Sequence, residues 1–144
     1  MRGTVVCAVM DGNDGNGDAL ALGVELSERL GLRLVLAHPV DGIPAAKDAE
    51  SVTTKFDRQG AERRLADLAR DHGVAASAAR RVAVGEPAAL LGRIAAEEAA
   101  DVIVIPTSAR GWRRRLDGRL AADLETETPV PVLIAPPRRG RKRS

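Results

Sequence analysis

Short apolar runs alternate with amphipathic stretches along the whole chain, and this alternation limits the possible folds more than any other feature. The runs are rich in Val, Ile and Leu, which is typical of strands buried on both faces of a parallel sheet. The stretches between them carry apolar residues at helical spacing. The predicted strands are 4–9, 32–38, 79–84, 101–105 and 130–135, and the predicted helices are 19–30, 61–72, 87–95 and 116–125.

This β-α-β-α-β-α-β-α-β order predicts a doubly wound, five-stranded parallel sheet with helices on both faces, which is a Rossmann-like α/β fold. A chain of 144 residues is long enough for one such core but not for two. We therefore expect one domain over 1–137, followed by a basic tail over 138–144. Pro131 has no N–H to donate, so the last strand is expected at a sheet edge.

The basic residues are concentrated at the C-terminus. Lys and Arg number 22 against 20 Asp and Glu, and the tail 138–144 holds five of the basic residues and no acid, which leaves 17 against 20, or −3, for the rest. Aromatic residues make up only 1%. A slightly acidic body with few aromatic rings is not typical of a nucleic-acid-binding domain. We expect the tail to be a disordered, solubilising end, and salt-sensitive attachment to nucleic acid or an acidic partner is the less favoured alternative.

Cellular location is indicated by three features. Cys7 is the only cysteine, so no internal disulfide can form. No apolar run approaches the ~20 residues of a membrane span. The first predicted strand begins directly after 1–3, which leaves no room for a signal peptide. We therefore expect a cytoplasmic protein without a membrane partner.

Doubly wound sheets bind ligands outside the carboxyl ends of their strands, where the strand order reverses. Those ends are predicted at 9–13, at 38–40, at Gly85 and at 106–108. The last of them begins a basic loop over 106–117 that carries Thr107, Ser108, Arg110 and three further arginines, and this loop leads into a helix. Such junctions hold anions through backbone N–H groups and arginines. The alternative is a solvated loop whose arginines pair with surface acids.

No catalytic or metal-binding constellation is predicted. The chain has no Gly-Lys-Ser/Thr of a phosphate-binding loop, no Gly-x-Ser-x-Gly, and no serine with a nearby base. Asp14, Asn16 and Asp18 have the spacing of a calcium loop, but Ala19 stands where the sharp turn needs glycine. We interpret this segment as a turn in which Asp18 caps the following helix.

Four segments resemble the universal stress protein family, over about residues 3–137. Residues 5–13 resemble its first strand and Asp-Gly-Ser, with Asn13 in place of the serine; 31–38 resemble its second strand and histidine; 85–88 resemble its Gly-x-Pro turn; and 130–134 resemble its closing strand. The resemblance implies the fold of the adenine nucleotide alpha hydrolases. It also implies a stress-response role and a homodimer paired through the last strand, here Val130 to Ala135.

Some members of this family bind ATP through Gly-x-x-Gly-x9-Gly-Ser/Thr after the fourth strand. This chain departs from that motif with Pro106, Ala109, Gly118 and Arg119 at the corresponding positions. Proline has no N–H to donate, alanine resists positive φ, and arginine replaces a small hydroxyl. We therefore expect no tight ATP binding of the family type.

Two functions follow from the resemblance and the departures from it. The first is a non-catalytic stress-response regulator that acts as a homodimer. Slow ATP hydrolysis is a less favoured function, because Asp11 is the only candidate for a catalytic base or metal ligand. The alternative is a regulator that binds ATP or another adenine nucleotide. Asp11 would then accept from the adenine amino group while Arg110 and Arg119 hold phosphates. The candidate contacts are Asp11, Gly12, Asn13, His38, Val40, Thr107, Ser108, Arg110, Gly118 and Arg119.

Overall fold

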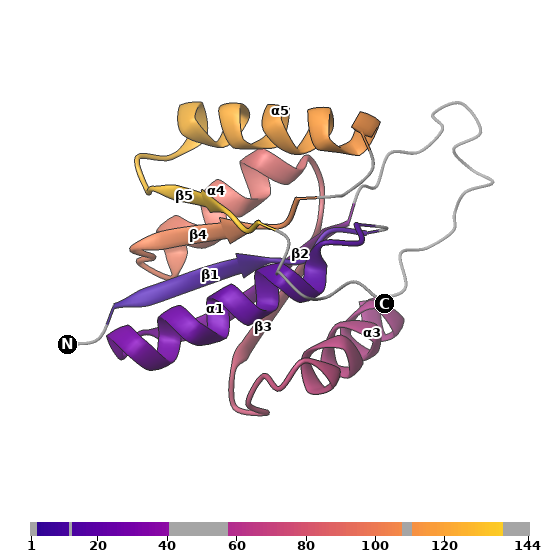
Figure 1. The fold of residues 1–144 in the computed structure, drawn as a ribbon, viewed down its shortest axis with the longest axis vertical. Coiled ribbons are helices and arrows are strands. Elements are labelled where there is room, and N and C mark those ends of the chain that lie inside the picture. The colour runs from indigo at the N-terminus through magenta and orange to yellow at the C-terminus, as the bar shows by residue number, and fades with distance from the viewer. Residues whose placement is uncertain (1–2, 12, 41–57, 108–110, 137–144) are drawn as a thin grey trace.

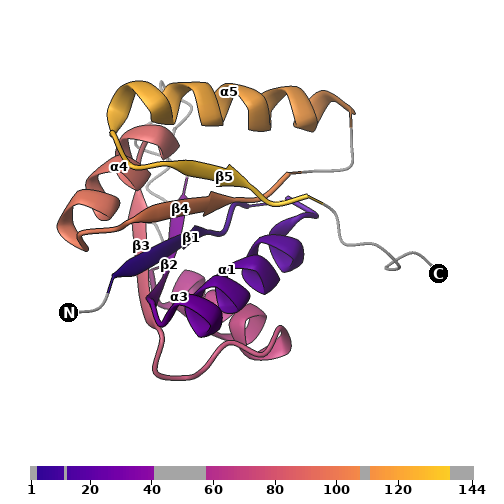
Figure 2. The ribbon, with the colours of Figure 1, turned by 60° about the vertical axis from the view of Figure 1, so that its left-hand side comes forward.

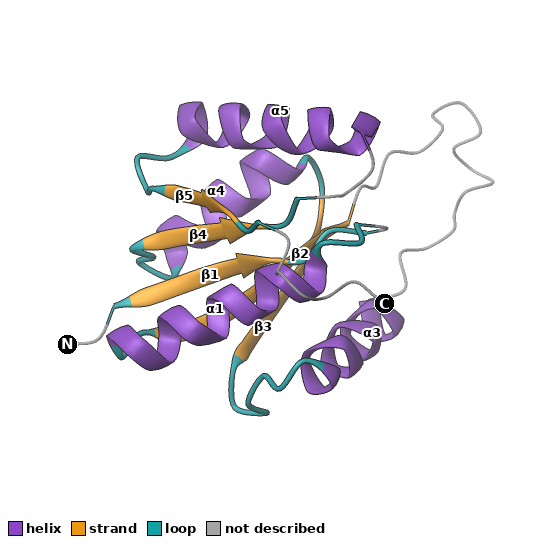
Figure 3. Cartoon of the chain, in the orientation of Figure 1, coloured by secondary structure: helices purple, strands orange, loops and turns teal. Residues whose placement is uncertain are grey.

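A computed structural model describes residues 3–11, 13–40, 58–107 and 111–136, and the backbone alone over 111–117. The elements follow in the predicted order (Figures 1 and 3). They are β1 (Thr4–Ala8), α1 (Asn16–Leu30), β2 (Arg33–Val40), α3 (Arg58–Asp71), β3 (Ala79–Val84), α4 (Pro87–Glu97), β4 (Val102–Ile105), α5 (Gly111–Glu127) and β5 (Val132–Ile134). The predicted tail 138–144 lies outside the described residues.

The sheet has five parallel strands in the order β3-β2-β1-β4-β5. The chain starts in the middle of the sheet, moves outward through β2 and β3, and then returns to build β4 and β5 on the other side (Figure 1). The strand order therefore reverses between β1 and β4. The doubly wound architecture predicted from the sequence is confirmed, as is the edge position of the last strand.

Helices cover both faces of the sheet, with α1 and α3 on one side and α4 and α5 on the other (Figure 2). Alternate side chains of β1 enter different cores: Val5 and Cys7 pack toward α1 and α3, whereas Val6 and Ala8 pack toward α4 and α5. Burial on both faces explains why this strand is apolar from Val5 to Ala8. Burial also raises the pKa of the Cys7 thiol to about 12, so Cys7 stays protonated as part of the core.

The first helix begins earlier than predicted. The prediction that Asp18 caps it is wrong, because α1 starts at Asn16 and the carbonyl of Gly15 accepts from the N–H groups of Asp18 and Ala19. Asp18 instead lies buried in the first turn, where a negative charge interacts favourably with the helix dipole. The predicted end is confirmed, since Gly31 follows the helix with a φ of 68°.

The last helix also begins earlier than predicted, and this difference affects the candidate site. The expected basic loop over 106–117 and short helix over 116–125 are wrong, because α5 is continuous over Gly111–Glu127. Arginine and leucine favour helices, so a basic run next to an apolar helical stretch extends the helix instead of ending it. The other strand ends differ less: β2 continues to Val40, and β5 is only three residues long.

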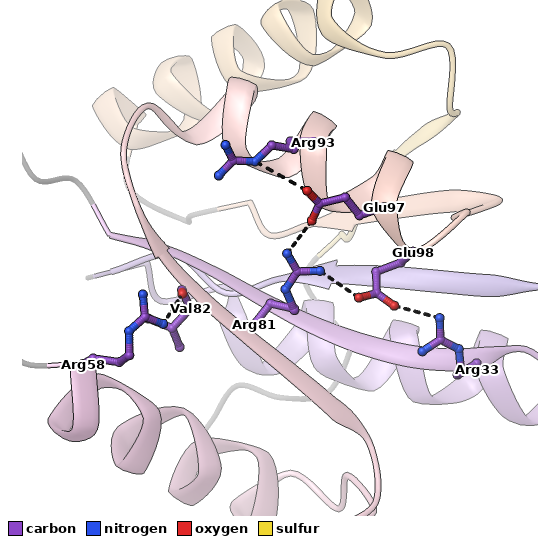
Figure 4. A network of polar contacts seen from close by, with 7 residues as sticks. All are labelled: Arg33, Arg58, Arg81, Val82, Arg93, Glu97 and Glu98. Atoms are coloured by element: carbon purple, nitrogen blue, oxygen red, sulfur yellow. Dashed lines mark hydrogen bonds and ion pairs between the residues drawn. The ribbon is translucent and has the colours of Figure 1, made fainter.

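A network of ion pairs joins β2 and β3 to the C-terminal end of α4 (Figure 4). Arg81 of β3 contacts both Glu97 and Glu98, and Glu98 also accepts from Arg33 of β2 at 2.8 Å. Hydrogen bonds from Arg33 and Arg81 lower the pKa of the Glu98 carboxyl. The network lies near the start of β2, away from the carboxyl ends of the strands.

Within the described parts of the chain, no helix is both long enough and apolar enough to cross a membrane.

Candidate functional site

The candidate site lies where the strand order reverses, at the adjacent carboxyl ends of β1 and β4. Asp11 follows β1, and Thr107 follows β4. Their segments touch at Gly15, because a Cβ added to this glycine would lie 2.0 Å from the carbonyl oxygen of Thr107. Only glycine fits at that distance, so the loop between β1 and α1 packs directly on the segment after β4.

Asn16 holds the backbone just before Asp11, a role that was not predicted from the sequence. Its Oδ1 accepts from the N–H of Met10 at 3.0 Å, and its Nδ2 donates to the carbonyl of Met10 at 2.8 Å. This two-point contact fixes the direction in which the chain leaves β1. The available signal was an asparagine in a glycine-rich loop, where such side chains bond to nearby backbone.

Asn13 is part of the loop's own hydrogen bonding. Its Oδ1 accepts from the N–H of Gly15 at 2.7 Å, and its backbone N–H donates to the carbonyl of Met10 at 3.2 Å. The side chain is buried. The structure thus places this predicted ligand contact in an Asx-type turn that stabilises the loop beside Asp11.

His38 connects β2 to the end of β1. Although the residue is only 5% exposed, its ring lies between two polar atoms: Nδ1 is 2.8 Å from the carbonyl oxygen of Val9, and Nε2 is 3.4 Å from Oδ1 of Asp11. The Asp11 side chain is 65% exposed. The structure therefore brings together two residues that the sequence predicted at the same sheet edge, one buried and one open to solvent.

The contact with Val9 determines which ring nitrogen of His38 carries a proton. A carbonyl oxygen can only accept, so Nδ1 must donate. In a neutral ring, Nε2 then presents a lone pair toward Asp11, whereas a protonated ring donates from both nitrogens. With a neutral ring, Nε2 of His38 and Oδ1 of Asp11 are two acceptors that face each other. With a protonated ring, Nε2 donates a charge-assisted hydrogen bond to Oδ1.

Val40 ends β2 at the same edge of the sheet and is half-buried. Its carbonyl accepts from the N–H of Gly85 at 3.0 Å. The predicted strand ends at 38–40 and at Gly85 are therefore joined by a backbone hydrogen bond. Together with Asp11, His38 and Thr107, they form a continuous border along the carboxyl edge.

Two of the remaining predicted contacts lie inside the last helix. Gly118 and Arg119 are the eighth and ninth residues of α5, and both are exposed. Amide hydrogens inside an α-helix are donated to the carbonyl four residues earlier. A phosphate cradle made from the backbone of these two residues therefore does not form in this structure. The predicted contacts Gly12, Ser108 and Arg110 lie outside the described residues.

A polar hollow of about 330 Å³ lies beside the site, between the loop after β1 and the end of α3. The His72 ring packs against the start of α1, since a Cβ on Gly17 would lie 2.6 Å from its Cε1. The lining residues are Asn13, Asp14, Asn16, Gly17, Asp18, Leu68 and His72. Among the described residues, no three His, Cys, Asp or Glu side chains are grouped as metal ligands.

Comparison with known proteins agrees with this architecture. The model of the universal stress protein family matches residues 1–136. A family member from Burkholderia pseudomallei is 27% identical with a TM-score of 0.68, over 93% of this chain and 96% of that one. A universal stress protein solved in complex with cAMP is 24% identical, with a TM-score of 0.62 over 93% of this chain and 96% of that one.

A more distant structure has the same fold. The universal stress protein from Archaeoglobus fulgidus in complex with dAMP is 21% identical, with a TM-score of 0.62 over 94% of this chain and 98% of that one. No curated protein sequence matches significantly. Because the family model spans nearly the whole chain and the fold agrees, this chain belongs to the universal stress protein family.

Proposed function

We propose that this protein is a non-catalytic regulator of the stress response, which acts as a homodimer and does not hold ATP in a phosphate cradle of the family type. The observation that carries the proposal is the early start of α5 at Gly111. Because Gly118 and Arg119 lie inside this helix, their backbone N–H groups are used within it. Pro106 also has no N–H to offer a phosphate.

The outer edge of β5, which pairs with no other strand of the described residues, supports the dimer. The residues that flank β5 in the chain show which backbone groups pair with β4. The N–H of Ala135 donates to the carbonyl of Ile105, and the carbonyl of Pro131 accepts from the N–H of Ile103. Because backbone groups alternate along a strand, those of Val132 and Ile134 face away from β4. Leu133 is 41% and Ile134 is 44% exposed. An uncharged edge strand of this kind is suited to pair with the same strand of a second copy.

The dimer is tested by placing a charge on this edge. We expect Ile134→Lys to convert the dimer to a monomer, measured by light scattering after gel filtration, because a lysine on an edge strand opposes pairing. The control is Leu30→Lys, which charges another exposed apolar side chain, at the end of α1. A monomeric wild type would contradict the dimer, and a dimeric Ile134→Lys would contradict β5 as its interface.

A second candidate function is binding of an adenine nucleotide at Asp11 without a triphosphate cradle. Two observations favour it: Asp11 lies beside His38 with its side chain exposed to solvent, and two of the similar structures are complexes with cAMP and dAMP. Asp11 would accept from the adenine amino group, and the carboxyl edge would hold the sugar. The β- and γ-phosphates would then contribute little to affinity.

Calorimetric titration with AMP and ATP tests both candidate functions. If the second function is right, AMP and ATP bind with similar affinity, and Asp11→Ala weakens both by about 10-fold, the loss of about one hydrogen bond to a charged group. Asp71→Ala, which removes an exposed aspartate at the end of α3, is the control. If neither AMP nor ATP binds, the second function is contradicted and only the first remains. ATP binding at least about 10-fold tighter than AMP would show a working phosphate cradle and contradict the first proposal.

A further inference from the structure

Among the described residues, the sheet ends in two edge strands that no further strand covers, and these edges differ in chemistry. One edge is β3 and the other is β5. On its outer side, each edge strand presents a row of backbone N–H and C=O groups that pair with no other strand of the described residues. If both edges could pair with other copies, β5 of one copy could join β3 of the next, and the sheet would grow as an open chain. A closed assembly therefore requires that one of the two edges cannot pair with another copy.

The outward backbone groups of β3 can be identified from its last hydrogen bond. The N–H of Gly85 donates to Val40, so Gly85 points its backbone toward β2. Backbone groups alternate in direction along a strand, so the carbonyl of Val82 points to the free edge. That carbonyl is an acceptor which a further strand would have to reach in order to extend the sheet.

The side chain of Arg58 already donates a hydrogen bond to this carbonyl. Arg58 is the first residue of α3, and its Nη1 donates to the carbonyl oxygen of Val82 at 2.8 Å (Figure 4). Glu62, one turn later, lies 3.9 Å from the same guanidinium nitrogen and helps to hold it there. The Val82 side chain is buried in the core that α3 covers. The start of α3 is thus attached to the middle of the edge strand.

The rest of β3 adds charge to this edge. Arg80, two residues before Val82, is exposed. A strand that approached β3 would have to displace the Arg58 guanidinium and desolvate a second arginine. At the other edge, β5 consists of Val132, Leu133 and Ile134 and carries no charge. Charged side chains on an edge strand are a common means of preventing edge-to-edge association.

We infer that Arg58 caps the β3 edge, so that the chain assembles with a second copy only through β5 and the assembly closes at two subunits. The part of this inference that concerns β5 rests on the proposed dimer, whereas the closure of β3 does not. A symmetric pair through one edge uses both available strands and leaves nothing for a third copy.

Removal of the cap tests the inference. Light scattering after gel filtration, over a series of protein concentrations, is expected to show Arg58→Ala assemblies of about twice the wild-type mass or more, since an open β3 edge adds one further contact per copy. Arg58→Lys keeps a charge and a donor and is expected to retain the wild-type mass. Arg63→Ala removes an exposed arginine from the same helix and is the control. A folded Arg58→Ala protein that keeps the wild-type mass at every concentration would overturn the inference.

A second substitution separates edge pairing from unfolding. Val84 is exposed on β3, and Arg58→Ala/Val84→Lys places a new charge on the uncapped edge without restoring the contact to Val82. We expect this double variant to return to the wild-type mass. Aggregation of a merely destabilised protein would not be reversed in this way, and failure of the lysine to reverse it would contradict β3 pairing.

The proposed dimer can fail independently of the cap. A monomeric wild type whose Arg58→Ala variant still self-associates would refute the β5 dimer but support the cap. A dimeric wild type whose Arg58→Ala variant stays dimeric would support the dimer but refute the cap.

Discussion

At the scale of the residue, the candidate site depends on side chains that bond to backbone. Asn16 holds Met10 at two points, Asn13 holds Gly15, and His38 is anchored on the carbonyl of Val9. These buried or half-buried contacts leave Asp11 as the exposed acid at the end of β1. The exposed residue was predictable from its place in the loop, but its supports were not, because their partners depend on how the loop turns.

His38 has two contacts that different substitutions separate. In His38→Asn the amide nitrogen can replace Nδ1 and still donate to Val9, whereas nothing replaces Nε2 beside Asp11. We expect His38→Ala to lower the free energy of unfolding by about 1–3 kcal/mol, because a buried carbonyl loses its donor, and His38→Asn to lower it by less. Urea unfolding measures both.

The same pair of variants reports on ligand binding. If an adenine nucleotide binds at Asp11, both substitutions should weaken it by about 2–10-fold, because Asp11 loses the ring that lies 3.4 Å from its Oδ1 and limits its orientation. A His38→Asn protein as unstable as His38→Ala would show that the bond to Val9 is not what holds the ring.

At the scale of the element, the ion-pair network attaches the edge strand β3 to the helix α4. Glu98 accepts from Arg33 of β2 and from Arg81 of β3, so a single carboxylate joins three elements. Its side chain is largely shielded from solvent, unlike those of the ion pairs within helices. The sequence offered no sign of this network, since its partners are up to 65 residues apart.

Glu98→Gln is expected to lower stability in a pH-dependent way. The pKa of this carboxyl is lowered in the folded state, chiefly by the hydrogen bond from Arg33, so its charge stabilises the fold above the unfolded-state pKa of about 4.3. That contribution disappears as the pH falls through the lower folded-state pKa. We expect a loss of about 1–2 kcal/mol at neutral pH.

Unfolding by urea at neutral and acidic pH tests this expectation. The difference between wild type and Glu98→Gln should vanish at acidic pH, once the carboxyl is protonated. Glu25→Gln is the control, because Glu25 pairs with Arg29 within one exposed helix and should cost no more than about 0.5 kcal/mol. A difference that persists unchanged at low pH would show that the side chain contributes by packing and not by charge.

At the scale of the whole molecule, we propose that the two edges of the sheet control assembly. A dimer that forms through β5 couples folding to association, so the melting temperature should rise with protein concentration. Differential scanning calorimetry of wild type should show this rise. Ile134→Lys should lose the concentration dependence while keeping the helical content of wild type, and a concentration-independent melting temperature in wild type would contradict a dimer coupled to folding.

The family assignment follows from features that extend over the entire chain. Strand and helix periodicities, the segment 5–13 and the closing strand all occur in the order that the family model matches over 1–136. These features could be predicted because the three central strands, β1, β2 and β4, are mostly buried on both faces and so stay almost entirely apolar, whereas the edge strands β3 and β5 are partly exposed. Boundaries were less predictable, as the ends of α1 and α5 show.

The sequence by itself determined the fold class, the order of the elements, the sheet edge occupied by the last strand and the family. All of these depend on local periodicity and on proline chemistry, which do not require knowledge of distant partners. Only the tertiary structure decided that α5 starts at Gly111, that His38 contacts Val9 across 29 residues, and that Arg58 contacts Val82 across 24. Such contacts form between segments that packing alone brings together, so no local pattern encodes them.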